Sequence, residues 1–358
     1  MRPFSWFHRR GAFTPVAFAA ACILAVEGVG RISAGAGADA AAVLGIAFMV
    51  VAWREGERVW PSHETVPTPP VGTTVRDVET ALGGGSTPLR IAVIGDIQNG
   101  VAELVDLLRE ARRRGHDLVL LLGDCANAGR PERYALLRTV LRENLPGVPV
   151  LAVPGNHDLD DAGSCTTWTS WVGPPHWRLD LRGWRLLGLD DAAGPLTPAS
   201  VALLRESAAS PPPRGLVLVS HRQLFARDDE TRDVVRARVR QLAASGLSPS
   251  AVLALAGHGH ANEEFTDAAG TRHVVQGENC DRSGESESAF VGAATMTLGD
   301  GPPAYEIWRV RRRARLADEL RRLAVTGVFP WIRGRWLGPL LWAAGLLASV
   351  AVRRLIFR

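Results

Sequence analysis

Five short apolar runs between residues 89 and 260 share one design, in which a hydrophobic stretch is followed by a small residue and then by polar side chains that can bind metal ions. The runs occupy 89–95, 117–122, 148–153, 215–219 and 251–256. Their lengths and composition are typical of buried strands. Because α/β sheets form their sites at the carboxyl ends of strands, we expect the five polar ends to meet at one rim.

The remaining pattern between residues 89 and 308 predicts an α/β domain. Further strands are expected at 184–189, 272–276, 290–298 and 304–309, and helices at 101–114, 131–143, 197–209 and 230–245. Strands that alternate with helices favour an α/β class, here with a second half that is richer in strands.

The polar side chains at the five strand ends are Asp96, Gln98, Asp124, Asn156, His157, His221, His258 and His260. Residues two apart in an extended segment point the same way, so each such pair can face one point. Carboxylate and amide oxygens suit cations such as Mn²⁺, Mg²⁺ or Fe²⁺. A single residue of this kind is better explained as a turn residue or a structural histidine, but five converging ends are not. The ligand number predicts two ions, and Asp124, which has no paired neighbour, is the candidate for the shared carboxylate.

The motifs D-x-Q, G-D-x-x-N, G-N-H-D, S-H and G-H-G-H occur in this order. As a set they resemble the five blocks of the calcineurin-like metallophosphoesterase family, with a membrane-anchored bacterial member as the expected type. The resemblance covers residues 89–308. It implies a four-layer α/β/β/α sandwich with a dinuclear metal site at one edge.

The resemblance also implies a role for each matched residue. The first ion would be held by Asp96, Gln98, Asp124 and His260, and the second by Asp124, Asn156, His221 and His258. His157 would act as the acid near the leaving group, tuned by Asp158. The family usually has His where this chain has Gln98, and an amide oxygen favours Mn²⁺, while Fe²⁺, Mg²⁺ and Zn²⁺ stay open.

The expected reaction is hydrolysis of a phosphoester by a metal-bridging hydroxide, since two cations lower the pKa of a water between them. Arg222 and Arg130 could clamp a phosphate, although surface arginine is the commoner role. The alternative is a non-catalytic metal-binding scaffold or signalling protein with the same fold. The sequence distinguishes neither a monoester from a diester or pyrophosphate nor one oligomeric state from another.

The ends of the chain predict membrane attachment. The chain is 46% hydrophobic and carries a net charge of +4, most of its excess near the ends, which favours a membrane surface over nucleic acid. We expect a membrane hairpin at 1–60, a Pro/Gly-rich linker at 61–88, the catalytic domain at 89–308, a basic amphipathic segment at 309–335 and a C-terminal membrane segment at 336–358. Arginine placement predicts a multi-pass protein with a cytoplasmic catalytic domain, whose substrate could be lipid-linked. The alternative is a secretion signal and anchor, with the enzyme working outside.

The cysteines predict no structural zinc site. Cys22, Cys125, Cys165 and Cys280 contain no C-x-x-C pair, so scattered reduced thiols are expected. Pairing of Cys165 with Cys280 would need an oxidising compartment.

Overall fold

The structure is a computed structural model that describes residues 34–61, 71–85, 88–225, 233–246, 251–260, 262–277, 290–312 and 316–334. The chain divides into two compact units, one of Met1–Glu64 with Leu316–Arg358 and one of Thr65–Arg315. The five polar strand ends all belong to the second unit.

The first sheet of the second unit, sheet A, has five strands in the order β11-β10-β1-β2-β3. Its strands are β1 (Leu89–Ile94), β2 (Leu118–Leu122), β3 (Val150–Val153), β10 (Phe290–Leu298) and β11 (Ala304–Arg311). Strands β1, β2 and β3 are parallel, whereas β10 and β11 run antiparallel to their neighbours. The parallel strands therefore end at the same edge of sheet A.

The second sheet, sheet B, has six strands in the order β4-β5-β6-β7-β9-β8. Its strands are β4 (Trp177–Leu181), β5 (Trp184–Gly188), β6 (Gly215–Val219), β7 (Ala251–Ala256), β8 (Glu263–Thr266) and β9 (Arg272–Val275). Strands β5, β6, β7 and β9 are parallel, and β4 and β8 are antiparallel edge strands. Both sheets are therefore mixed, and the expected α/β class is confirmed.

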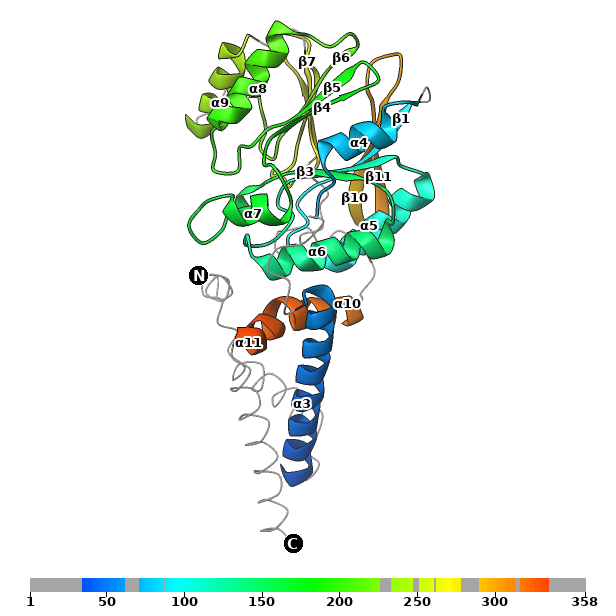
Figure 1. Ribbon diagram of the computed structural model, residues 1–358, viewed down its shortest axis with the longest axis vertical. Helices are drawn as coiled ribbons and strands as arrows, with labels where there is room; N and C mark the ends of the chain where they lie inside the picture. The colour runs from blue at the N-terminus through cyan, green and yellow to red at the C-terminus, as the bar shows by residue number, and fades with distance from the viewer. Residues whose placement is uncertain are drawn as a thin grey trace. The chain divides into compact units, whose positions relative to one another are not determined.

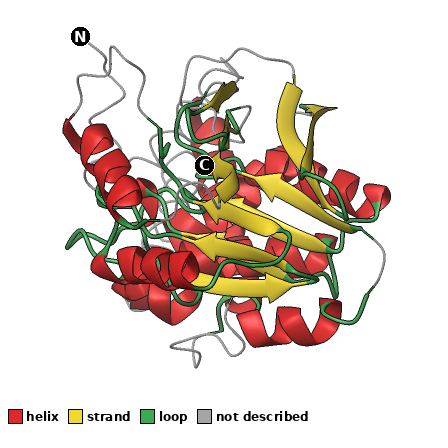
Figure 2. Ribbon diagram, turned by 90° about the horizontal axis from the view of Figure 1, so that it is seen from above, coloured by secondary structure: helices red, strands yellow, loops and turns green. Residues whose placement is uncertain are grey.

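The two sheets pack face to face, with helices on their outer sides (Figures 1 and 2). One core cluster joins Leu120 of β2 to Leu186 of β5, whereas the next residue, Leu187, packs with Leu204 of α8 (Pro198–Ala209). Successive strand residues point to opposite faces, so each sheet has an inner and an outer side. Helix α9 (Asp233–Ala244) lies beside α8, and α5 (Val101–Arg114) packs with α6 (Pro131–Asn144) next to sheet A.

The structure contains every expected strand and helix of this unit, with end differences of a few residues. It adds β4, β8, the short helix α7 (Thr166–Trp171) and the 3₁₀ helix η1 (Asn156–Asp158), which the apolar pattern did not indicate. Cys125 and Cys165 are free thiols, and Cys22 and Cys280 lie outside the described residues.

The expected linker at 61–88 contains a helix, α4 (Val75–Leu82). Thr74 caps it by accepting a hydrogen bond from the Asp77 N–H. Val78 is buried in the core cluster between the sheets. The prediction that nothing in this range could pack against a core is wrong. The range as a whole is rich in Pro and Gly, and this composition outweighed the short amphipathic segment within it.

The described residues of the first unit form α3 (Ala34–Val59), α10 (Leu316–Leu323), the π-helix η2 (Ala324–Val328) and α11 (Phe329–Gly334). The ring of Trp53 meets that of Phe329 edge-on, with centroids 5.7 Å apart, and the Arg333 guanidinium lies 3.7 Å from the Trp60 ring centroid. Trp53 and Trp60 therefore pack within this unit. The expected basic segment at 309–335 is divided, because β11 continues to Arg311 before α10 begins.

Among the described residues, no helix is both long and apolar enough to cross a membrane. The apolar part of α3 covers only 40–53, shorter than the ~20 residues that a span needs, and charged residues follow it. The expectation of a multi-pass membrane protein with a cytoplasmic catalytic domain is therefore wrong for this part of the chain. The first apolar run of the predicted hairpin and the segment at 336–358 lie outside the described residues.

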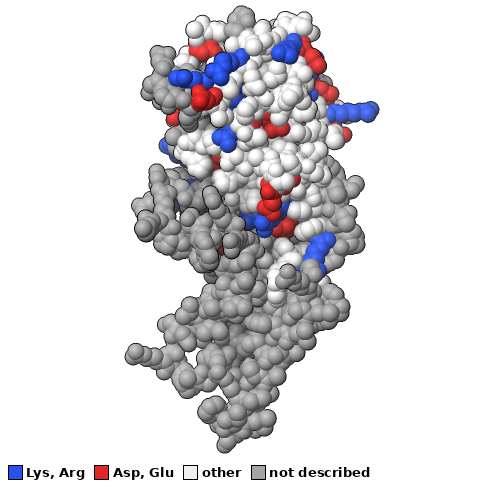
Figure 3. Space-filling view, turned by 90° about the vertical axis from the view of Figure 1, so that its left-hand side faces the viewer, with Lys and Arg blue, Asp and Glu red and all other residues white. Residues whose placement is uncertain are grey.

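Charged side chains of both signs are interspersed on the face of the second unit shown in Figure 3. Blue and red side chains lie close to one another there. This face therefore presents no large field of one sign.

Candidate metal centre

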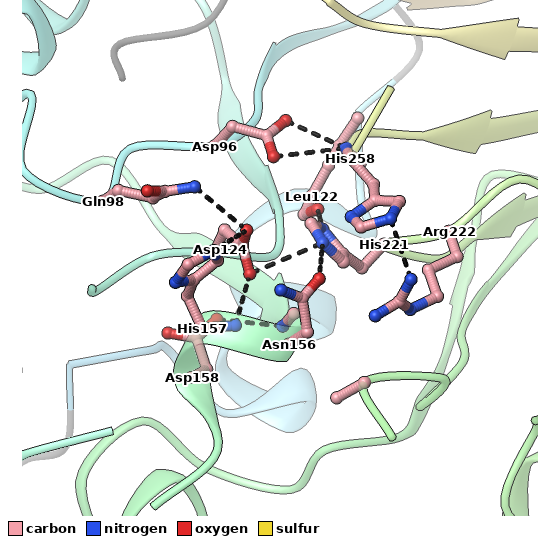
Figure 4. A network of polar contacts seen from close by, with 12 residues as sticks. Asp96, Gln98, Leu122, Asp124, Asn156, His157, Asp158, His221, Arg222 and His258 are labelled. Carbon is pink, nitrogen blue, oxygen red and sulfur yellow. Dashed lines mark hydrogen bonds and ion pairs between the residues drawn. The ribbon is translucent and has the colours of Figure 1, made fainter. Parts of the chain in front are cut away.

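The five predicted strand ends meet at one place, and both sheets contribute to it (Figure 4). Sheet A supplies the loops after β1, β2 and β3, and sheet B supplies the loops after β6 and β7. The first two loops run side by side, since the Asp96 N–H donates to Gly123 O at 3.2 Å and the Gln98 N–H donates to Asp124 O at 2.8 Å. The structure thus brings together residues that are up to 164 positions apart in the chain, from Asp96 to His260.

Asp124 lies at the centre of the cluster and is buried. Its Oδ2 accepts a hydrogen bond from Gln98 Nε2 at 3.2 Å, and its Oδ1 lies 3.4 Å from His221 Nε2. The two carboxylate oxygens therefore face two different groups of side chains, as a carboxylate shared by two ions would.

Asp96 is the second buried carboxylate of the cluster. His260 Nε2 lies 3.7 Å from its Oδ1, and the His258 N–H donates to its Oδ2 at 3.0 Å. The ligand atoms of Asp96, Asp124 and His221 all lie within 4.8 Å of one another. This spacing allows one cation to contact all three groups.

The contacts of His221 test whether the site suits a cation. Its Nδ1 lies 2.8 Å from Leu122 O, and since that carbonyl only accepts, Nδ1 carries the proton. The lone pair of Nε2 then faces Asn156 Oδ1 at 3.1 Å and Asp124 Oδ1 at 3.4 Å. Three acceptors that face one another without a proton repel, and a metal ion removes that repulsion. The residues therefore fit a metal centre.

Burial keeps His221 and His258 neutral. It lowers the pKa of His221 to about 3 and that of His258 to about 3, with a contribution from neighbouring positive charges. Burial also raises the pKa of the Asp124 carboxyl, against the lowering effect of His157. Neutral imidazole is the form that binds metals, and a cation would offset the cost of burying the carboxylate.

The backbone of the site is unusual. Seven non-glycine residues in the described part of the chain have a positive φ. Five of them are predicted ligands, namely Asp96, Gln98, Asp124, His258 and His260, with φ between 44° and 64°. Such conformations cost about 1–3 kcal/mol each and persist where the surroundings enforce them, often at functional sites. The apolar pattern along the chain does not signal this strain.

Two glycines next to the ligands leave room for ligand side chains. A Cβ on Gly123, whose φ is +85°, would lie 2.6 Å from His221 Nδ1. A Cβ on Gly155 would lie 2.2 Å from Asp124 Oδ1. The small residues between strands and ligands therefore allow loops from different strands to approach closely.

His157 lies at the edge of the cluster, and 42% of its side chain is exposed. Its Nε2 is 4.0 Å from Asp124 Oδ2, and its Nδ1 contacts Asn127 Oδ1 at 3.1 Å. Asn127 has no role among the sequence-based predictions, although it is the last residue of the G-D-x-x-N motif. Its amide oxygen can only accept, so Nδ1 is the protonated nitrogen of neutral His157.

Asp158, expected to tune His157, binds backbone instead. Its carboxylate accepts N–H groups of Cys125, Ala126 and Gly155 at 2.9–3.0 Å and the hydroxyl of Tyr134 at 3.2 Å. Burial and the nearby Asp124 charge raise the pKa of Asp158 to about 8, against the lowering effect of these N–H groups. The residue joins the loop after β2 to the loop after β3.

The two predicted phosphate-binding arginines lie in different surroundings. Arg222 Nη1 is 2.8 Å from His258 Nε2, within the cluster. Arg130 precedes α6, and its Nη2 lies 3.5 Å from Asp161 Oδ1. Arg222 therefore contacts a predicted metal ligand, His258, whereas Arg130 pairs with the acidic side chain of Asp161.

Comparison with known proteins shows what this chain is similar to. A family model for calcineurin-like phosphoesterases matches residues 89–262. A glycerophosphodiester phosphodiesterase, GpdQ, of Enterobacter lignolyticus is 43% identical over 63 residues, which are 18% of this chain and 22% of that protein. A probable cyclic nucleotide phosphodiesterase of Synechococcus is 32% identical over 116 residues, which are 32% of this chain and 38% of that protein. The matched segments thus span less than two fifths of each relative.

A dimetal phosphatase from Danio rerio has a similar fold. Its crystal structure superimposes with a TM-score of 0.50 and 14% identity, over 63% of this chain and 100% of that chain. At this identity, the likeness supports the fold alone.

Proposed function

We propose, from the membership of residues 89–262 in the calcineurin-like phosphoesterase family, that this chain is a metal-dependent hydrolase of phosphodiesters. The observation that carries the proposal is the position of Asp124, whose two oxygens face Gln98 on one side and His221 on the other. The choice of a diester follows the two matched relatives, both of which are named phosphodiesterases.

The proposed centre holds two divalent ions, with Mn²⁺ favoured by the Gln98 amide. The ligands assigned to the first ion are Asp96, Gln98, Asp124 and His260, and those assigned to the second are Asp124, Asn156, His221 and His258. When bound, two such metal ions lower the pKa of a water molecule and neutralise charge on the phosphoryl oxygens.

His157 is the proposed general acid. Asn127 accepts the hydrogen bond of the Nδ1–H, so when the ring is protonated on both nitrogens its Nε2–H is free to give a proton to the departing oxygen of the ester, which leaves His157 neutral. The exposure of the side chain leaves it open to substrate. An amide partner fixes the ring without adding a negative charge, unlike the carboxylate of Asp158 that was expected in this place.

Arg222 is the proposed phosphate-binding residue. Its guanidinium lies beside His258, and its Nε is buried without a hydrogen-bond partner in the described structure. A phosphate oxygen would satisfy such a donor. Arg130, which pairs with Asp161, is given no part in the proposal.

The test is hydrolysis of bis(p-nitrophenyl) phosphate and p-nitrophenyl phosphate by the full chain, first freed of metal with a chelator and then supplied with Mn²⁺, Mg²⁺, Fe²⁺ or Zn²⁺. We expect Mn²⁺-dependent turnover of the diester, and a loss of more than about 100-fold in Asp124→Asn. The matched control is Asp180→Asn, which makes the same change on strand β4.

Equal losses in Asp124→Asn and Asp180→Asn would contradict the assignment of the site. A folded chain that binds Mn²⁺ but hydrolyses neither ester would instead favour the non-catalytic scaffold. Preferential hydrolysis of the monoester would contradict the diester assignment.

A further inference from the structure

A buried pair of opposite charges lies behind the turn that carries His221. Asp191 follows strand β5 and is 0% exposed, and Arg238, on helix α9, is 2% exposed. Neither residue was among the predicted site residues. Charges are rarely buried so fully unless they are paired, so the contacts of this pair need an explanation.

Both carboxylate oxygens of Asp191 bind the backbone of the ligand turn. Oδ1 accepts the N–H of His221 at 3.1 Å, and Oδ2 accepts the N–H of Arg222 at 3.0 Å. Holding two successive N–H groups fixes the peptide between these residues. It therefore fixes the directions in which the imidazole leaves toward Asp124 and the guanidinium leaves toward His258.

Arg238 ties the same turn to the loop that carries Asp191. Its Nε donates to Gln223 O at 3.2 Å and lies 3.9 Å from Asp191 Oδ2, and its Nη1 donates to Gly194 O at 2.9 Å. One guanidinium thus holds the loop after β5 and the loop after β6. Its planar fork suits this geometry, which the single ammonium group of lysine cannot reproduce.

We propose that Asp191 and Arg238 are positioning residues that set the places of His221 and Arg222 in the metal centre, an inference that rests on the proposed function. Residues that orient metal ligands typically change metal affinity or activity by about 10- to 100-fold when they are replaced. A pair that only stabilised the fold would change stability and leave the metal affinity of the folded protein unaltered.

The chain contains a matched control pair near the opposite end of strand β5. Arg185, which is 5% exposed, donates from Nε to Asp180 Oδ1 at 2.7 Å. It also donates to the Ser210 carbonyl. The control has the same two residue types on the same sheet but binds no metal-ligand turn.

The experiment measures Mn²⁺ affinity of the chelator-treated full chain by isothermal titration, with urea unfolding of the same samples. The variants are Asp191→Asn and Arg238→Lys, beside Asp180→Asn, Arg185→Lys and Asp124→Asn. We expect Mn²⁺ binding that is about 10- to 100-fold weaker in the Asp191 and Arg238 variants and unchanged in the Asp180 and Arg185 variants. If Asp191→Asn does not fold, the Mn²⁺ affinity of Arg238→Lys, which keeps the positive charge, decides the test.

The failure of this inference differs from the failure of the proposed function. Wild-type protein that binds no Mn²⁺, or binds it equally well after Asp124→Asn, contradicts the metal centre itself. Wild-type binding that depends on Asp124, with Asp191 and Arg238 variants that lose only unfolding free energy as the control variants do, overturns the positioning role.

Discussion

The ligand loops of the two sheets are each held by a buried carboxylate, but the two carboxylates have different partners; we call these two arrangements the two devices. On the side of sheet A, the buried carboxylate of Asp158 accepts three backbone N–H groups and the neutral hydroxyl of Tyr134. On the side of sheet B, the buried carboxylate of Asp191 accepts two backbone N–H groups and lies beside the charged Arg238.

The two carboxylates have different partners because the ligand loops of the two sheets differ in their other hydrogen bonds. The loops after β1 and β2 already bind each other through Asp96 N–H and Gln98 N–H, so Asp158 adds to an existing backbone network. Three N–H groups around a carboxylate offset much of the cost of burying it. Asp191 has one N–H fewer, and a guanidinium makes up the difference by binding the carbonyls of both loops. Three substitutions test whether the two devices are equivalent.

Asp158→Asn should have the largest effect on stability. The amide keeps the shape but turns N–H donors toward backbone N–H groups, which leaves buried donors unsatisfied. We expect the unfolding free energy to fall by about 3–5 kcal/mol in urea titrations. Asp180→Asn, whose side chain is 42% exposed, should lose no more than about 1 kcal/mol. Equal losses would mean that the buried hydrogen bonds of Asp158 stabilise the fold no more than the exposed contacts of Asp180.

Gly155→Ala should have an intermediate effect and should act directly on the site. The new Cβ would lie 2.2 Å from Asp124 Oδ1 and 2.4 Å from Asp124 N, so the ligand loop must shift. We expect a loss of about 1–3 kcal/mol in unfolding free energy and about 10-fold weaker Mn²⁺ binding.

Gly84→Ala is the control for that steric effect, because a Cβ added there would have no atom within 4 Å among the described residues. It should change the unfolding free energy by less than about 0.5 kcal/mol and leave Mn²⁺ binding unaltered. Unchanged Mn²⁺ affinity in Gly155→Ala would show that the loop after β3 does not constrain Asp124.

Tyr134→Phe should have the smallest effect and separates the two devices most clearly. It removes a hydroxyl that donates to Asp158 O at 3.0 Å and to Oδ1 at 3.2 Å, at a cost of about 1 kcal/mol. Tyr305→Phe, which removes a hydroxyl that donates to Gln276 at 2.9 Å, should cost about as much. If Tyr134→Phe weakened Mn²⁺ binding as strongly as Arg238→Lys, the neutral and charged partners would have the same role.

Much of the fold and of the site was predictable from local pattern. Apolar runs indicated the strands of both sheets, and the residues after them indicated the ligand candidates, because strand burial and the polar residues at strand ends are local properties. The pattern failed at α4, a short helix between Pro- and Gly-rich stretches, and at the chain ends, where apolar composition suggested membrane spans that the described helices do not provide.

The order of residues along the chain was enough to name the candidate side chains of the site, which all stand at strand ends: Asp96, Gln98, Asp124, Asn156, His157, His221, His258 and His260. The order of their motifs resembles that of calcineurin-like phosphoesterases, whose family model matches residues 89–262. The residues that position these side chains could be identified only from the tertiary structure. Asn127 rather than Asp158 contacts His157, and Asp191 and Arg238 lie behind His221. The physical reason is distance along the chain: Asp191 and His221 are 30 residues apart, and no local pattern encodes a contact that depends on the pairing of β5 with β6.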